Sequence, residues 1–288
     1  MVVYLNNKFD IMGEKMTTIK RILIFLGIIL LTFSCQIWEK DNMDFTYPLE
    51  TGRTWTYQRE WILTNFDSDS LEQIFGYSES YETTSTVTGP QTLNDSIDVI
   101  GLLAGDRTYY YKKETDGLYL VGYNMNSGEL VIPKNTQKDG IIINGVYFNS
   151  IEQLFDILQY PFSLMKPTTD SIYIEENPKK VLEYPLKDAG MWCYREDYKP
   201  FRIDKQIIGT DTISIGTSTF NCYHIKWNYD IDADGITDDN IYIDDYISKE
   251  GLIKRTISVL NMINQNAFGD TLGTYDSFDY YTLKNYTK

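Results

Sequence analysis

The sequence predicts an all-β fold, mainly antiparallel, that forms one large curved sheet or open half-barrel with one short helix. Three observations predict it. The chain contains 24 Tyr and 5 Trp, and aromatic residues favour half-buried strands. Its body alternates apolar and polar residues between clusters of turn residues. A segment that begins at Tyr47 recurs at Tyr184, so the body is expected to consist of two related halves.

The recurring segment reads YPLETGRTWTYQRE at its first occurrence and YPLKDAGMWCYRED at its second. The Tyr, Pro, Leu, Trp and Tyr positions match without a gap, each 137 positions apart. Two copies at this distance do not make a solenoid. We therefore expect a single β-rich domain over residues 47–288, built from halves at 47–183 and 184–288.

The first half is expected to be a meander of antiparallel strands. Its first strand places Trp55, Tyr57 and Arg59 on one face. Breakers such as Gly89-Pro90 and Asp116-Gly117 separate the later runs. Their spacing favours hairpins over βαβ units. The expected strands after the first lie near 76–87, 96–103, 107–113, 117–123 and 129–133.

One short amphipathic helix is predicted over residues 150–159. Ser150 and Gln153 fit the ends of a capping box. Apolar residues then recur at helical spacing. This apolar stripe is expected to pack on the sheet, and the alternative is a groove for a partner.

The second half restarts at Tyr184. In its strand over 219–229, alternation places Ile225 and Trp227 on one face, and His224 and Lys226 on the other. The expected strands are 191–196, 201–208, 212–215, 219–229, 240–247, 252–262 and 274–284.

The N-terminus has the pattern of a secretory signal peptide. Basic residues precede an apolar run over 22–33, which is shorter than the roughly 20 residues of a membrane span. Because Cys35 follows directly after Ser34, the segment resembles a bacterial lipoprotein signal. An ordinary signal peptide or an anchor helix is the alternative. That resemblance implies a signal peptide over 1–34 with Met16 as the true start, and acylation of Cys35 by chains such as palmitate. Residues 35–46 would then be a tether, and Gln36 favours the outer membrane, on its periplasmic face or at the cell surface.

The charge of the chain limits its partners. It has 26 basic and 41 acidic residues, a formal net charge of −15. Such a chain repels phosphate backbones and anionic head groups, which excludes nucleic-acid binding and polybasic membrane docking. The expected partners are the membrane, through the lipid anchor, and an envelope protein or a glycan.

An acidic loop is the one motif with recognisable chemistry. Its D-x-D-x-D-G-x-x-D spacing is typical of calcium loops, because alternate carboxylates point inward and Gly permits the bend. The bidentate Glu of such loops is absent, and Asp239 and Asp244 are the alternatives. The other interpretation is a solvated hairpin tip. The expected ligands of a structural, weakly bound Ca²⁺ are Asp230, Asp232, Asp234, Ile236 (through its carbonyl) and Asp238.

Cysteine and histidine are sparse. Beyond Cys35 the chain has Cys193 and Cys222, and an oxidising envelope would permit a disulfide between them. Two free thiols in strands are the alternative. His224 is the single histidine, so there is little material for a zinc or Cys–His catalytic site.

The order of short motifs resembles that of a broad group of uncharacterised bacterial envelope lipoproteins. The matching segments are YPL-x5-W-x-Y, the Asp116-Gly117-Leu118-Tyr119 turn, the second YPL-x5-W, GTSTFNCY and SKEGLIKR. Ser218 stands where the pattern has Gly. The resemblance covers most of residues 45–255 and implies a β-rich, half-barrel-like domain with no established activity.

These observations favour a non-catalytic envelope lipoprotein that binds a partner or ligand. A glycan-binding accessory that uses clustered Tyr and Trp is the second interpretation, and exposed aromatic residues in a row would favour it. A carboxylate-dependent hydrolase is the third, and it needs two carboxylates ~5–10 Å apart in a cleft. No catalytic residue is singled out.

Overall fold

The computed structural model describes residues 45–125, 140–151, 154–155, 158, 172–198, 201–266 and 268–287. Residues Thr46–Lys288 form one compact unit. The predicted signal peptide, Cys35 and the expected strand at 129–133 lie outside the described residues. None of the helices in the described part is long and apolar enough to cross a membrane.

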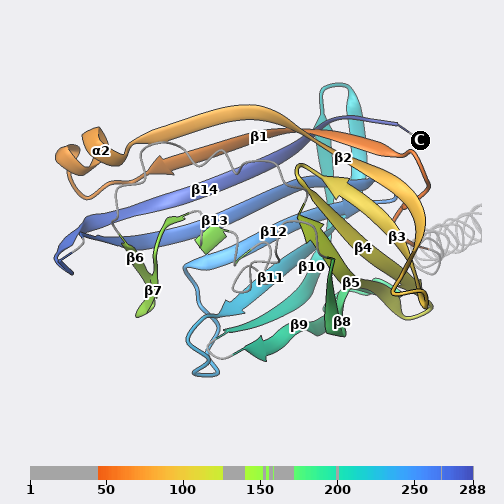
Figure 1. Ribbon diagram of the computed structural model, residues 1–288. Helices are drawn as coiled ribbons and strands as arrows, with labels where there is room; N and C mark the ends of the chain where they lie inside the picture. Colours follow the sequence, from red (N-terminus) through yellow and green to blue (C-terminus); the bar gives the residue numbers. More distant parts are fainter. Residues whose placement is uncertain are drawn as a thin grey trace, which may run out of the picture. The chain divides into compact units, whose positions relative to one another are not determined.

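The domain is an antiparallel sheet that curls into a nearly closed barrel (Figure 1). The first half contributes β1 (Thr54–Thr64), β2 (Tyr77–Leu93), β3 (Ile97–Ala104), β4 (Arg107–Glu114), β5 (Gly117–Met125) and β8 (Tyr173–Glu183). The second half contributes β9 (Met191–Tyr198), β10 (Phe201–Ile215), β11 (Ser218–Asp230), β12 (Ile241–Ser248), β13 (Gly251–Gln265) and β14 (Thr271–Tyr286). A small hairpin of β6 (Gly140–Ile143) and β7 (Val146–Phe148) pairs with β13.

The strand order is β8-β5-β4-β3-β2-β1-β14-β13-β12-β11-β10-β9. Each half is therefore a six-stranded meander, and the two meanders meet twice. At the first junction β14 pairs with β1 along a ladder from Trp55↔Tyr286 to Thr64↔Asp276. The second junction, between β8 and β9, is called the seam below.

No β-ladder joins β8 to β9 within the described residues. Side-chain hydrogen bonds to backbone carbonyls cross the seam. The Trp192 indole N–H donates to the Lys180 carbonyl at 3.0 Å, and Lys205 Nζ donates to the Val181 carbonyl at 3.2 Å. The predicted all-β curved sheet of two halves is thus confirmed, with the barrel closed by a ladder at one junction and by side chains at the other.

Two strands run further than the sequence predicts, because a bulge replaces each expected break. β2 continues through Gly89-Pro90, with a register shift at Gly89, whose φ is 103°. Beyond Thr86, β2 is paired only with β3, so the missing N–H of Pro90 costs little. β10 continues through residues 209–211, with a register shift at Gly209. Bulges of this kind add a residue and bend the strand without ending it.

Two other elements differ from prediction. The seven-residue helix α2 (Asp69–Phe75) was not expected; the Ser68 hydroxyl caps it by accepting from the Leu71 N–H. The second is β8, whose residues 175–183 are not among the expected strands. For the helix expected over 150–159, Ile151, Leu154, Phe155 and Leu158 are helical, and the last three are buried.

Candidate functional site

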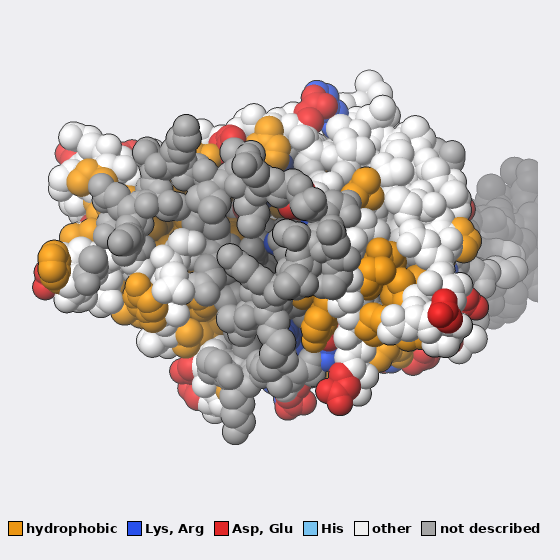
Figure 2. All heavy atoms as spheres, in the orientation of Figure 1, with side chains coloured by type: hydrophobic (Ala, Val, Ile, Leu, Met, Phe, Trp, Pro, Cys, Tyr) orange, Lys and Arg blue, Asp and Glu red, His pale blue; other side chains and the backbone are white. Residues whose placement is uncertain are grey.

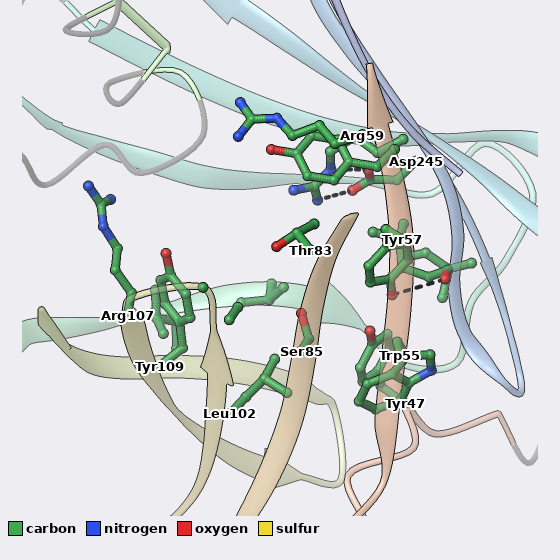
Figure 3. Close-up of a pocket in the computed structure, with 18 of the residues that line it drawn as sticks. Tyr47, Trp55, Tyr57, Arg59, Thr83, Ser85, Leu102, Arg107, Tyr109 and Asp245 are labelled. Atoms are coloured by element: carbon green, nitrogen blue, oxygen red, sulfur yellow. Dashed lines mark hydrogen bonds and ion pairs between the residues drawn. The ribbon is translucent and has the colours of Figure 1, made fainter. Parts of the chain in front are cut away.

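The barrel encloses a cavity of about 420 Å³. Side chains from all twelve strands of the curled sheet line it. Figure 3 shows inward-pointing residues of β1 to β4 around the same space. Alternation along β1 explains part of this lining, because Trp55, Tyr57 and Arg59 share the inner face as predicted. This cavity is the candidate functional site.

Aromatic rings of β1 form one wall, and each ring is fixed by its polar atom. The Trp55 indole N–H donates to the Glu250 carbonyl at 2.6 Å, and the Tyr57 hydroxyl donates to the Leu252 carbonyl at 3.2 Å. The Trp61 indole N–H donates to Ser277 Oγ at 2.9 Å. Because the polar atoms are bonded to the surrounding strands, the ring faces are left as apolar contact surface in the cavity.

Two ion pairs with buried carboxylates and half-buried arginines lie at the cavity wall. Arg59 donates to both carboxylate oxygens of Asp279, with Nη2 to Oδ2 at 2.6 Å. Arg255 donates to both oxygens of Asp245, at 2.6 and 2.8 Å, and the Trp227 indole N–H donates to Asp245 at 2.9 Å. Burial alone would lower the pKa of Arg59, but its hydrogen bond to Asp279 raises that pKa overall. The two arginines are therefore held charged against carboxylates.

Lys205 is the most deeply buried of the other cationic residues that line the cavity, with 2% of its surface exposed. Its Nζ lies 3.6 Å from the ring centroid of Trp227 and 4.2 Å from that of Tyr194. Burial lowers the pKa of Lys205 well below its ordinary value; Asp245 opposes this shift and Arg255 reinforces it. Contacts with two ring faces stabilise the ammonium form and partly compensate for its desolvation.

Lys205 is not among the site residues that the sequence predicts. A lysine within an alternating strand normally lies on the solvent face. One signal was available: Ile203, Lys205 and Ile207 share a face of β10, and both isoleucines are buried, at 0% and 2% exposure. A lysine between two isoleucines on the core face indicates a buried amine.

The predicted calcium loop lies between β11 and β12, and none of its residues lines the cavity. Asp230, Asp232 and Asp234 converge, with ligand atoms within 4.8 Å of one another. Their carboxylates also accept backbone N–H groups of the loop, such as Gly235 N–H to Asp230 Oδ2 at 3.0 Å. These bonds alone account for the bend, so calcium binding stays a prediction.

The other predicted ligands are placed differently. The Asp238 carboxylate accepts from the Ile231 N–H at 2.7 Å and from the Asn144 amide. Burial raises the pKa of Asp238. The Ile236 side chain is exposed. Asp244, one of the alternatives for the missing ligand, lies on β12 beyond the loop, 2.7 Å from His224 Nε2.

His224 lies outside the cavity. Its Nδ1 is 3.5 Å from Asp211 Oδ2, and its ring stacks on Tyr246 with centroids 4.5 Å apart. It is a packed surface histidine with two acidic neighbours, and no general-base geometry toward the cavity results.

Of the two alternatives for Cys193 and Cys222, the structure has two free thiols and no disulfide between them. Cys193 on β9 is opposite Asp204 of β10, and Cys222 on β11 is opposite Asp211 of the same strand. These positions lie about 20 Å apart along β10 at ~3.3 Å per residue, whereas a disulfide needs Cα atoms within ~7 Å. Burial raises the pKa of Cys222 to about 12.

Charged and apolar side chains are distributed unevenly on the surface. Figure 2 shows hydrophobic side chains gathered over the β4–β5 region, whereas acidic side chains lie mainly around the periphery. The aromatic residues with the largest exposure in the described part are Tyr81, Tyr147 and Phe268, at 36%, 53% and 91%. They belong to different elements, so they do not form a row.

No protein-family model and no curated protein matches the chain. One solved structure that matches is a candidate lipoprotein from Parabacteroides distasonis; it is 15% identical, with a TM-score of 0.28, and the match covers 85% of this chain and 100% of that one. Another is a candidate exported protein with a YmcC-like fold from Bacteroides fragilis; it is 12% identical, with a TM-score of 0.27, over 85% and 99%. The chain therefore resembles lipoprotein-like and exported proteins in structure. At these TM-scores the likeness carries no argument about the site.

Proposed function

We propose that this chain is a non-catalytic lipoprotein of the bacterial cell envelope, anchored through Cys35, which binds a small ligand inside its barrel. The observation that carries the proposal is the cavity of about 420 Å³, lined by aromatic rings and charged groups. This volume lies within the ~300–1,000 Å³ that is typical of ligand pockets. A barrel that served only as a packed scaffold would fill its interior with side chains.

Binding accounts for the charged residues of the cavity better than hydrolysis does. A hydrolase of the glycosidase type needs one carboxylic acid and one carboxylate positioned for reaction. Both carboxylate oxygens of Asp245 and of Asp279 accept hydrogen bonds from an arginine. These bonds fix the orientation of each carboxylate, which suits a wall. Burial raises the pKa of Asp279, and its hydrogen bonds to Arg59 oppose this shift.

Envelope location is supported by the sequence, through the basic and apolar segments before Cys35. Replacing Cys35 with Ser should release the domain from the membrane fraction into the soluble fraction and abolish incorporation of radiolabelled palmitate. Continued membrane retention of the Cys35→Ser protein would contradict the proposed anchor.

A substitution that fills the cavity tests whether the ligand binds inside it. Thr83 of β2 points into the cavity (Figure 3), whereas its neighbour Thr84 is exposed on the other face. The uncharged probe N-phenyl-1-naphthylamine should bind the wild-type domain with one site per chain and gain fluorescence. Thr83→Trp should lower its affinity at least about tenfold, because the indole occupies the ligand space, whereas the matched Thr84→Trp should bind like wild type.

Equal binding by both variants would place the probe outside the cavity and contradict the proposal. Near-ultraviolet circular dichroism of each variant shows whether the barrel is intact, so that a loss of fold is not read as a filled cavity.

Glycan binding is the second candidate, favoured by one feature of the outer face. The rings of Phe278 and Tyr280 on β14 are parallel, at an interplanar angle of 6° with centroids 6.0 Å apart. Parallel half-exposed rings offer a platform for a sugar face. Phe278→Ser with Tyr280→Ser should then reduce retention on purified envelope polysaccharide and leave binding of the naphthylamine probe unchanged. Retention equal to that of wild type would remove this candidate.

A further inference from the structure

Four cationic residues line the cavity, Arg59, Arg107, Lys205 and Arg255, and their neighbours differ. Arg59 is paired with Asp279, and Arg255 with Asp245, each through two or more hydrogen bonds. These pairs are close to electrically neutral. They therefore give the cavity little net attraction for a charged ligand.

Lys205 lines the same cavity, and it makes no ion pair with any residue that the structure describes. One of its three N–H groups donates to the Val181 carbonyl. The rings of Trp227 and Tyr194 lie against Nζ on two other sides. A buried ammonium with one hydrogen bond has unused donors, and burying such a group is costly unless a partner accepts them.

We propose that the cavity binds a small apolar molecule with one anionic group, such as a carboxylate or sulfonate, and that Lys205 Nζ holds this group. The aromatic and aliphatic wall contacts the apolar part. The ligand anion completes the hydrogen bonding of Lys205 and neutralises its charge inside the barrel. This assignment rests on the proposed function and specifies the class of ligand.

Because the chain as a whole is acidic, the attraction for an anion has to come from groups inside the cavity. The whole chain carries a net charge of −15, so an anion gains nothing from the surface as a whole. Inside the cavity a buried, hydrogen-bonded cation outweighs distant charges, because nearby interactions are strengthened by the low dielectric constant of the protein interior and distant ones are screened.

A pair of probes separates this inference from the proposed function. 1-Anilinonaphthalene-8-sulfonate and N-phenyl-1-naphthylamine share the same ring system, and only the first carries an anion. If the cavity binds ligands, both should bind. If Lys205 holds an anion, Lys205→Met should weaken the sulfonate probe at least about tenfold, as expected for the loss of a buried hydrogen-bonded charge partner, and should leave the neutral probe within about twofold.

Lys226→Met is the matched control. Lys226 is the neighbouring lysine on the outer face of β11, where its Nζ lies 5.0 Å from the ring centroid of Tyr242. The Lys226→Met variant should bind both probes like wild type. Equal effects of Lys205→Met on the two probes would overturn the anion site and leave the binding cavity standing, whereas failure of both probes to bind the wild-type domain would contradict the proposed function itself.

A pH profile of the wild-type protein tests the same site without a substitution. Burial lowers the pKa of free Lys205, and a bound anion raises it. Affinity for the sulfonate probe should therefore be greatest below the free pKa and decline as the pH rises from 6 to 10.

The other groups that face Lys205 do not produce this decline. They are the Asp245–Arg255 ion pair and the Tyr194 hydroxyl, and burial raises the pKa of Tyr194 far above this range. The neutral probe should keep a flat profile. Parallel profiles for the two probes would overturn the assignment.

Discussion

The two junctions between the six-stranded meanders occupy equivalent places in the repeat but are closed differently. At β14–β1, ten residue pairs form a ladder, and the Arg59–Asp279 ion pair spans it. At the seam, one indole and one ammonium reach carbonyls of β8. The difference indicates that one junction gives the barrel its stability, whereas the other places a charged group beside the cavity.

An irregularity in β8 explains why the seam has no ladder. The partner of β5 jumps from Lys179 to Ile174 between Leu120 and Gly122, so the residues between them leave the regular pairing. Pro178 lies in this bulge and has no N–H to donate. A strand that is bent and short of donors presents few hydrogen-bonding groups to a neighbour.

The repeated motif lies at both junctions. Trp55 and Trp192, the equivalent tryptophans, each donate the indole N–H to a backbone carbonyl of another strand or turn. The two copies also touch, since the Tyr47 backbone N–H donates to the Tyr184 hydroxyl at 2.8 Å. A Cβ at Gly251 would lie 2.6 Å from Trp55 Nε1, so the glycine of SKEGLIKR is required by the tryptophan of the first motif.

The largest expected effect comes from breaking the ion pair of the laddered junction. Asp279→Ala leaves the half-buried Arg59 guanidinium without its carboxylate and should lower the free energy of unfolding by about 3 kcal/mol, the lower end of the range for a buried pair. Urea unfolding measures this loss.

Two further variants sharpen that experiment. Asp98→Ala removes an exposed strand aspartate and should change the free energy of unfolding by less than about 1 kcal/mol. Adding Arg59→Met to Asp279→Ala should restore part of the stability, because no unpaired charge remains. A double variant less stable than the single one would contradict the assignment of the loss to the unpaired arginine.

A smaller effect on stability is expected from Ca²⁺, through a loop that differs between the two halves. The β3–β4 connection is the short Gly105-Asp106 turn, whereas the corresponding β11–β12 loop carries the aspartate triad. If this loop binds Ca²⁺ with a dissociation constant of ~0.1–1 mM, 10 mM Ca²⁺ should stabilise the domain by ~1.4–2.7 kcal/mol.

Asp232→Asn with Asp234→Asn should remove this stabilisation and lower the melting temperature only when the ion is present. Thermal unfolding with Ca²⁺ and with chelator makes the comparison. An equal drop in chelator would reject the ion and leave the loop as a solvated hairpin tip.

The smallest expected effect is the difference between the stability losses caused by replacing Trp55 and by replacing Trp192. Trp55→Phe should cost about 2–3 kcal/mol, since the Glu250 carbonyl loses a donor in a buried position. Trp192→Phe should cost about 1 kcal/mol less, because its side chain is more exposed, at 7% against 1%, and its hydrogen bond is longer.

Hydrogen exchange separates the two tryptophans further. Trp192→Phe should speed exchange of β8 and β9 amides and leave those of β1 and β14 unchanged, because the latter are held by the ladder. Equal acceleration at both junctions would mean that the seam and the ladder open together.

Much of the fold was predictable, because alternation and turn residues are local signals. The first strand and its inner face, with Trp55, Tyr57 and Arg59, follow from period-two patterning. The bulges at Gly89 and Gly209 were not predictable, because a glycine that ends a strand and one that bends it have the same local sequence. The sequence left open whether Cys193 and Cys222 are bridged, because strand register decides the distance between them.

The candidate site was the least predictable part. Its residues come from twelve strands, and no two of the decisive groups are close in sequence: Lys205 meets Tyr194 of β9, Trp227 of β11 and Val181 of β8. A single lysine on a core face is the only trace that this arrangement leaves in the sequence.

The sequence by itself determined the class of fold, the two halves and the acidic character of the chain, because composition and short-range periodicity are properties of neighbouring residues. Only the tertiary structure decided that the sheet curls into a barrel with one laddered junction and one seam, and that Lys205 lies inside it without a carboxylate partner among the described residues. The physical reason is that closure and burial depend on which distant strands pair, and the energy of a buried charge depends on its neighbours in space.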